Sequence, residues 1–396
     1  MSDYLSEEVI TKILHNLPVK SLIRCTSVCK LWYSLIKNPH FISAQIAKTS
    51  LINIESNPNR LLLSHIHADE YSVGFENQEL KKYIPLHFPF KSGSRLPHAM
   101  GYSNGLLCLL DRRVALGRYE DKFILWNPSI RKSFTVPQPN FAFSLCVFCN
   151  DYVGFGFDSN TNDYKVLRMM IHLNEHHDND EELKFQIEIY SFNMNSWKIV
   201  TGDVPTDWIE NQWPYGSRLR LIKRAACLNN ALHWIVNHSK YKLILVFDMK
   251  DEVLREIMLP ECLAKDVASQ LCLKVFRDSS IAVINSIDLH SAHIWVMKEY
   301  RVVESWEKLI EVDGDQRRGR LTVLGFKRNG EVIPKFFRKP LTLSSAYASI
   351  DTYVESLALL DKGNAVEEKR PKRARRSDTE LSSILYSVFS IIFDLI

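Results

Sequence analysis

Apolar residues at the start of the chain follow a helical period. Up to Pro18 they recur every three or four positions, at Val9, Ile10, Ile13, Leu14 and Leu17. Ser6 can cap this first helix, with Glu7 and Glu8 in its first turn. A short apolar segment follows, and a third run has Val28, Trp32, Leu35 and Ile36 at i, i+4, i+7 and i+8 and is ended by Asn38-Pro39. Three short helices carry more apolar surface than they can hide, so part of it must meet the following domain or a partner.

After Phe41 the period changes from helical spacing to short alternating strands. A hairpin that starts with an aromatic residue recurs four times, and its anchors are Trp126, Tyr190, Phe247 and Trp295. A second, turn-rich hairpin precedes each anchor, so each repeat supplies four strands. Two further segments, 61–75 and 321–333, bring the number of repeats to about six.

Repeated four-stranded units are typical of propeller blades, because each sheet buries both faces against its neighbours. The expected fold class is α+β multidomain: a three-helix N-terminal unit followed by an all-β, six-bladed propeller-like domain. A β-sandwich is the alternative. The predicted domains are 1–45, a linker at 46–60, the β domain at 61–360 and a tail at 361–396.

The N-terminal segment resembles a known motif. From Leu5 to Phe41 the sequence L-x-E-E-V-I-x-x-I-L-x-x-L-P-V-K-S-L-I-R-C-x-x-V-C-K-x-W-x-x-L-I-x-x-P-x-F is similar to an F-box, except that Ser6 stands where the family usually has proline. The resemblance implies binding to the Skp1-type adaptor of a cullin-RING ubiquitin ligase. The candidate adaptor contacts are Leu5, Ile10, Ile13, Leu14, Pro18, Leu22, Val28, Trp32, Leu35 and Ile36.

A second resemblance covers the β region. The segments SNGLLCL, W-N-P-S-x-R-K, GFGFDSNTNDYKVLRM, N-x-x-L-H-W, F-D-M and IWVMKEYRVVESWEKL are similar to the plant F-box-associated domain, a kelch-like or propeller-like interaction domain. Its relatives include self-incompatibility-locus F-box proteins and F-box proteins that limit immune-receptor levels. After Gly330-Glu331 the chain departs from the family pattern and passes almost directly into a terminal Y-V-E-S-L element, so the last blade is expected to be short or closed differently.

Composition fits an ordinary globular protein of 396 residues, 46% of them hydrophobic. The net charge is +4, and because six positive charges lie within 369–376, the rest of the chain carries −2. The globular part is therefore not a nucleic-acid polycation. The eight cysteines are scattered and suit a reducing compartment, and no cationic, apolar leader opens the chain. We expect a cytoplasmic or nuclear protein.

Catalytic and metal motifs are weak. Gly154-Phe155-Gly156 lacks the third glycine of a dinucleotide loop. Cys146 and Cys149, with His172 and either His176 or His177, would make four zinc ligands, but 22 residues separate Cys149 from His172 where compact fingers use about 12 to 15. We expect no metal and no cofactor.

The candidate target-binding segment is 206–220, which has no strand pattern and carries the hot-spot residue types Trp208, Trp213, Tyr215 and Arg218. These aromatic side chains could equally pack under the blades. In the tail, a nuclear-import signal is indicated by Lys369, Arg370, Lys372, Arg373, Arg375 and Arg376. The apolar segment 381–396 has 16 residues, fewer than a membrane span needs, and a docking or membrane-surface helix is expected there.

The sequence therefore predicts a non-catalytic substrate receptor of an SCF-type ubiquitin ligase. Its expected partners are the Skp1-type adaptor, through it cullin and RING subunits, and an unidentified target protein. One alternative is a propeller-fold enzyme or carbohydrate-binding module with a helical packing element at its N-terminus. The other is a nuclear protein that binds nucleic acid through its basic tail.

Overall fold

The structure is a computed structural model, and it describes residues 6–52, 60–64, 71–75, 83–86, 97–115, 118–141, 143–144, 150–175, 181–200, 222–237, 241–265, 270–314, 319–337 and 350–362. Contacts divide the chain into two compact units, Met1–Gly363 and Asn364–Ile396. The second unit lies outside the described residues, and so do the basic and apolar segments of the predicted tail.

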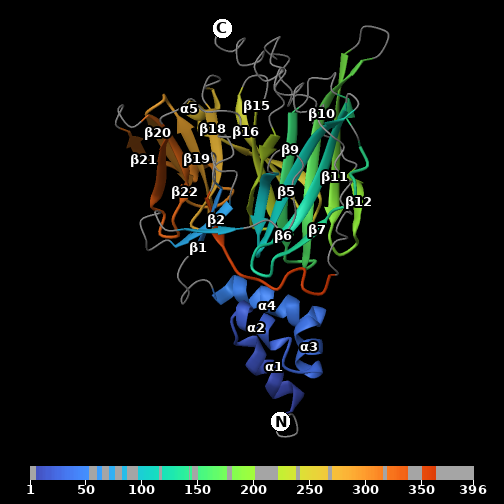
Figure 1. The fold of residues 1–396 in the computed structure, drawn as a ribbon. Helices are drawn as coiled ribbons and strands as arrows, with labels where there is room; N and C mark the ends of the chain where they lie inside the picture. Colours follow the sequence, from blue (N-terminus) through green and yellow to red (C-terminus); the bar gives the residue numbers. More distant parts are fainter. Residues whose placement is uncertain are drawn as a thin grey trace, which may run out of the picture. The chain divides into compact units, whose positions relative to one another are not determined.

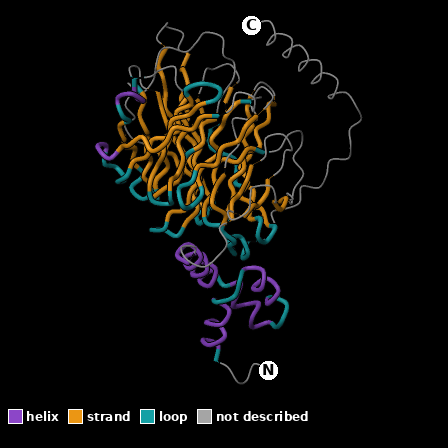
Figure 2. The backbone as a smooth tube through the Cα atoms, turned by 90° about the vertical axis from the view of Figure 1, so that its left-hand side faces the viewer, coloured by secondary structure: helices purple, strands orange, loops and turns teal. Residues whose placement is uncertain are grey.

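The first unit begins with helices and continues as strands (Figure 1, Figure 2). Its N-terminal helices are α1 (Glu7–His15), α2 (Val19–Cys25), α3 (Lys30–Lys37) and α4 (Pro39–Ile52). A short helix α5 (Glu261–Ala264) and a 3-10 turn η2 (Val303–Ser305) lie among the later strands.

The sequence predicts three N-terminal helices, whereas residues 6–52 form four. Helix α3 ends before Asn38-Pro39 as predicted, but Pro39 is also the first residue of α4, which was not predicted. Proline is well tolerated there because the first N–H of a helix has no partner within the helix. The Asn38 side chain accepts a hydrogen bond from the His40 N–H at 2.8 Å, as a cap does. Helix α4 then continues to Ile52, into the predicted linker.

The described strands form six antiparallel sheets, apart from one parallel pair. The first sheet has the order β24 (Ile350–Tyr353), β1 (Arg60–Ser64), β2 (Tyr71–Phe75) and β3 (Tyr83–Leu86). The second has β4 (His98–Ser103), β5 (Leu106–Ala115), β6 (Arg118–Asn127) and β7 (Lys132–Thr135), with β8 (Phe143–Ser144) paired to β6. The third has β12 (Ser196–Val200), β11 (Glu181–Ser191), β10 (Asp163–Glu175), β9 (Asn150–Asp158) and β13 (Ile222–Arg224), which runs parallel to β9.

The remaining sheets follow in chain order. The fourth has β14 (Ala226–Leu228), β15 (Ala231–Asn237), β16 (Lys242–Asp248) and β17 (Val253–Met258). The fifth has β18 (Gln270–Phe276), β19 (Ser280–Ser286), β20 (Ser291–Met297) and β21 (Trp306–Asp313). The sixth consists, within the described residues, of β22 (Arg320–Phe326) and β23 (Val332–Phe337).

The predicted repeat is visible in these sheets. The anchors Trp126, Tyr190, Phe247 and Trp295 lie on β6, β11, β16 and β20, the third strand of each of the second to fifth sheets in chain order. The first three are at most 1% exposed, and Trp295 is partly buried between sheets. Burial of these aromatic rings between neighbouring sheets explains why the sequence repeats them.

The two ends of the strand region meet. Strand β24, near the end of the first unit, pairs with β1, where Leu62 lies opposite Asp351. The Y-V-E-S-L element thus begins inside the first sheet, and this pairing removes an open strand edge. The N-terminal helices and the predominantly β, propeller-like domain agree with the expected fold class, while a count of six blades stays a prediction.

Candidate functional site

The N-terminal helices enclose a small apolar core. The Ser6 hydroxyl accepts a hydrogen bond from the Val9 N–H at 3.4 Å and so starts α1. Each helix contributes buried apolar side chains, namely Ile10, Leu14, Val19, Leu22, Ile36, Phe41, Ile42 and Ile46, each at most 6% exposed. These side chains belong to one apolar cluster that continues into the β domain.

Large apolar side chains remain on the outside of the same helices. Val9 and Ile13, one turn apart on α1, are 41% and 45% exposed. Val28, in the turn before α3, is 62% exposed, and Tyr33 on α3 is 46% exposed. So much exposed apolar surface on so few residues is typical of a protein-binding site.

The structure divides the predicted adaptor contacts into groups. Ile10, Leu14, Leu22 and Ile36 are buried in the core, so their side chains face away from any partner. Ile13, Pro18 and Val28 are exposed, and Trp32 and Leu35 are partly buried. Leu5 lies outside the described residues.

Two further exposed side chains of these helices, Val9 and Tyr33, are not among the predicted adaptor contacts. The signal for Val9 was present, because it stands four residues before Ile13 and shares its side of the helix. We define the adaptor face as the set of exposed or partly buried side chains Val9, Ile13, Pro18, Val28, Trp32, Tyr33 and Leu35.

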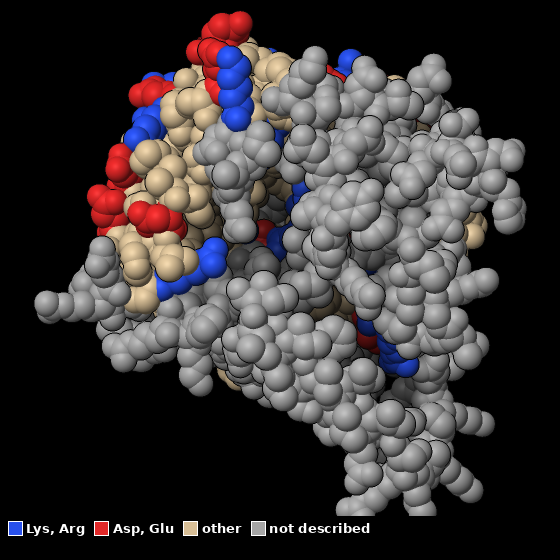
Figure 3. Space-filling model, turned by 90° about the horizontal axis from the view of Figure 1, so that it is seen from above, with Lys and Arg blue, Asp and Glu red and all other residues tan. Residues whose placement is uncertain are grey.

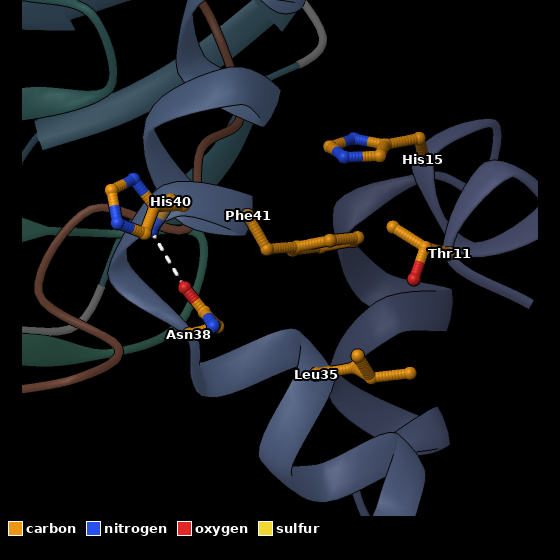
Figure 4. Close-up of a pocket in the computed structure, with 6 residues that line it drawn as sticks. All are labelled: Thr11, His15, Leu35, Asn38, His40 and Phe41. Carbon is orange, nitrogen blue, oxygen red and sulfur yellow. Dashed lines mark hydrogen bonds between the residues drawn. The ribbon is translucent and has the colours of Figure 1, made fainter. Parts of the chain in front are cut away.

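A shallow hollow of about 220 Å³ lies between α1, α3 and α4 (Figure 4). The His15 ring stacks on Phe41 with centroids 4.2 Å apart, and its Nδ1 lies 3.2 Å from Gln45 Oε1. Lys48 on α4 donates to the His15 carbonyl oxygen at 3.0 Å. These contacts fix α4 against the end of α1 and leave the edge of Leu35 beside the hollow (Figure 4).

The predicted target-binding residues Trp208, Trp213, Tyr215 and Arg218 all lie in 201–221, outside the described residues. On the face shown in Figure 3, the described acidic and basic side chains are interspersed. The described side chains on that face form no single-sign patch of the kind that binds nucleic acid.

A buried ionic cluster joins the second and third sheets. Asp121 accepts hydrogen bonds from Arg112 at 2.6 and 2.7 Å and from Arg168 at 2.8 Å. Arg168 also donates to Glu188 at 3.1 Å, and Arg112 lies 2.5 Å from Asp151. Burial alone would lower the pKa of Arg112, but its bonds to Asp121 and the nearby Asp151 raise that pKa above its usual value. Two guanidiniums thus pair with three carboxylates inside the protein, and we expect removal of one partner to destabilise the fold.

The residues that the structure describes contain neither a metal-binding cluster nor a membrane-spanning helix. Within them, no group of three or more His, Cys, Asp or Glu side chains could hold a metal ion. Among those same residues no helix is long and apolar enough to cross a membrane. Four of the possible zinc ligands lie outside the described residues, namely Cys146, Cys149, His176 and His177. The basic residues 369–376 also lie outside them.

Comparison with known proteins identifies both regions. Residues 3–43 match the model of the F-box domain, and residues 65–331 match the F-box associated beta propeller domain. The chain is 26% identical over 319 residues to F-box protein CPR1 of Arabidopsis thaliana, covering 77% of this chain and 72% of that protein. It is 27% identical over 316 residues to an F-box/kelch-repeat protein of Arabidopsis thaliana, covering 78% of this chain and 79% of that protein.

Among solved structures, that of YjhT is similar to this chain at 10% sequence identity, with a TM-score of 0.38, and the match covers 75% of this chain and 96% of YjhT. A similarity at this score assigns no activity.

Proposed function

This chain belongs to the family of F-box proteins that carry an F-box-associated β-propeller domain, and we propose that it is the substrate-recognition subunit of an SCF-type cullin-RING ubiquitin ligase. Proteins of this family generally act as substrate adaptors rather than as catalysts. In this proposal the F-box binds a Skp1-type adaptor, and the β domain binds a target protein for ubiquitination.

The observation that carries the proposal is the adaptor face. The F-box buries many apolar side chains in a cluster that continues into the β domain, yet Val28 is 62% exposed and Ile13 is 45% exposed. Each large apolar side chain that a partner covers contributes about 1.5 to 3 kcal/mol. A handful of such contacts offsets the cost of association and holds a stable complex.

The propeller-like domain then contributes by holding the target protein in position. The adaptor connects the receptor to cullin and RING subunits, and the RING subunit recruits the ubiquitin-charged enzyme. Holding the target nearby raises its effective concentration at that enzyme, while the bond-forming step stays on other chains. We place this complex in the cytoplasm or nucleus.

Single substitutions on the adaptor face test the proposal without disturbing the core. Ile13→Asp and Val28→Asp each place a carboxylate where the adaptor would cover an apolar side chain. We expect each to weaken binding of a purified Skp1-type adaptor by about 2 kcal/mol or more, roughly 30-fold. The measurement is titration calorimetry with the full chain.

Ile287→Asp is the matched control, since Ile287 is 50% exposed on the β domain. It introduces the same charge away from the F-box and is expected to leave the affinity unchanged. Circular dichroism checks that all three variants fold. A folded parent that binds no adaptor would contradict the proposal. Equal losses of adaptor affinity in all three variants would show that the adaptor face is not the binding surface.

A further inference from the structure

The last described segment of the chain is buried although it has no regular secondary structure. Residues 354–362, which we term the strap, follow β24 and include five consecutive buried residues, Ser356 to Leu360. Leu359 has φ +71°, an unusual conformation for a branched side chain. Five buried residues held in an irregular path must have specific partners, because their backbone groups cannot turn to water.

The turns of the second sheet supply those partners. The Asn127 side chain is fully buried, and its Nδ2 donates to the carbonyl oxygens of Ser356 at 2.9 Å and Ala358 at 2.8 Å. Lys132 Nζ donates to the carbonyl oxygens of Leu360 at 3.1 Å and Lys362 at 3.0 Å. Two side chains of the W-N-P-S-x-R-K segment therefore bind four backbone oxygens of the strap.

The S-N-G segment is also shaped around the strap. Gly105 has φ +86°, and a Cβ atom there would lie 2.1 Å from Ser356 Oγ. Tyr102 donates its hydroxyl to the Val354 carbonyl oxygen at 2.8 Å. The motifs that gave the family resemblance in this sheet thus serve, in part, to hold the end of the domain.

The other side of the strap reaches the F-box. Leu357, Leu359 and Leu360 belong to one continuous apolar cluster that also contains Phe41, Ile42 and Ile46 of α4. Lys20 on α2 lies 3.8 Å from the Glu355 carboxylate. A separate bond, from Asn162 Nδ2 to Ser43 Oγ at 2.9 Å, joins α4 to the β9–β10 turn.

We propose that the strap is a splint that fixes the F-box in one orientation on the propeller-like domain. Asn127 and Lys132 are its positioning residues, because they hold the strap in place and the strap shares an apolar cluster with α4 and places Glu355 3.8 Å from Lys20 of α2. The functional consequence rests on the proposed function. It is that a bound target presents a restricted set of lysines to the ubiquitin-charged enzyme. A loose joint would spread the target over many positions and lower the effective concentration of each lysine.

Two substitutions release the strap. Asn127→Asp replaces the donating amide with a carboxylate that faces two carbonyl oxygens, and Lys132→Met keeps the length of the side chain but removes its donor. Lys198→Met is the matched control, because Lys198 is an exposed lysine of β12 that pairs with Glu252 and does not touch the strap.

The direct readout is the distance between the two regions. A keto amino acid replaces Val28 and another replaces Leu289, since both positions are exposed. Each keto group is coupled to a spin label, and pulsed electron paramagnetic resonance measures the distance between the two labels. We expect one narrow distance distribution in the parent and in Lys198→Met, and a roughly doubled width in Asn127→Asp and Lys132→Met. Hydrogen exchange of residues 354–362 reports whether each variant has released the strap.

Each outcome of the distance measurement either supports or overturns the proposal. A broad distribution in the parent overturns the proposal, as does an unchanged width in a folded variant whose strap exchanges rapidly. If neither variant releases the strap, Asn127 and Lys132 are not its positioning residues. Lys132 is only partly buried, so its replacement keeps a folded variant available even if Asn127→Asp does not fold.

A second readout concerns ubiquitin transfer. In a reconstituted ligase, mass spectrometry of the receptor's own modified lysines should show few acceptors in the parent and more in Lys132→Met, with equal adaptor affinity. An identical acceptor pattern would contradict the functional consequence. If the parent binds no adaptor, the proposed function fails, whereas the distance measurement still tests the splint.

Discussion

The buried histidine of the fourth sheet gives the chain a predictable dependence of stability on pH. His233 on β15 is fully buried, and its Nδ1 lies 3.1 Å from the Ala226 carbonyl oxygen. Its Nε2 lies 2.7 Å from the Tyr300 hydroxyl. A neutral ring satisfies both contacts, donating through Nδ1 and accepting through Nε2. Burial lowers the pKa of His233 to about 4, and the nearby positive charge of Arg301 acts in the same direction.

The sign of the effect follows from proton binding. Between pH 4 and 6.5 the unfolded chain binds a proton on this ring, and the folded chain does not. Acidification therefore favours the unfolded state, and the free energy of unfolding falls as the pH drops below 6.5. With these two pKa values, the loss between about pH 7.5 and about pH 5 is about 2 kcal/mol.

The assay compares urea unfolding of the parent and of His233→Gln at both pH values. Glutamine offers a donor and an acceptor but does not titrate, so other groups cancel in the difference between the two proteins. We expect the parent to lose about 2 kcal/mol more than the variant on acidification. An equal loss in both proteins would refute the argument that this ring is held neutral.

Two further predictions concern the interior. Asp121→Asn removes the carboxylate that pairs with Arg112 and Arg168, so the free energy of unfolding should fall by about 3 to 5 kcal/mol in a urea melt. Glu252→Gln, which breaks the exposed pair with Lys198, should cost about 1 kcal/mol or less, and similar losses would argue against a structural role for the buried cluster. Burial raises the pKa of the Cys108 thiol, which is 0% exposed, whereas Cys29 is exposed. Native thiol labelling followed by mass spectrometry should modify Cys29 at least about 100-fold faster than Cys108, and comparable rates would show that the second sheet opens readily.

Sequence reasoning succeeded where a local pattern recurs. The aromatic anchors predicted the third strand of four sheets, because each repeat must bury a large ring at the same place. It predicted the end of α3 at Asn38-Pro39 correctly but missed α4, because a proline that cannot continue one helix can open the next.

The division between core and surface could not be derived from spacing. Ile10 and Ile13 belong to one apolar stripe in the sequence, yet the first is 4% exposed and the second is 45% exposed. Only the tertiary packing of the chain separates them, because Ile10 joins the apolar cluster and Ile13 does not. The contacts of the strap could not be predicted from the sequence either, since the residues that Asn127 contacts lie 229 and 231 positions further along the chain.

The most direct test of the adaptor face is site-specific photo-crosslinking. A benzophenone amino acid replaces Val28 in one protein and Ile287 in another, both exposed positions, and each protein is irradiated with a purified Skp1-type adaptor. The account predicts a covalent complex with the adaptor from position 28 and none from position 287. Equal yields from the two positions, or no product at position 28 in a folded protein, would contradict it.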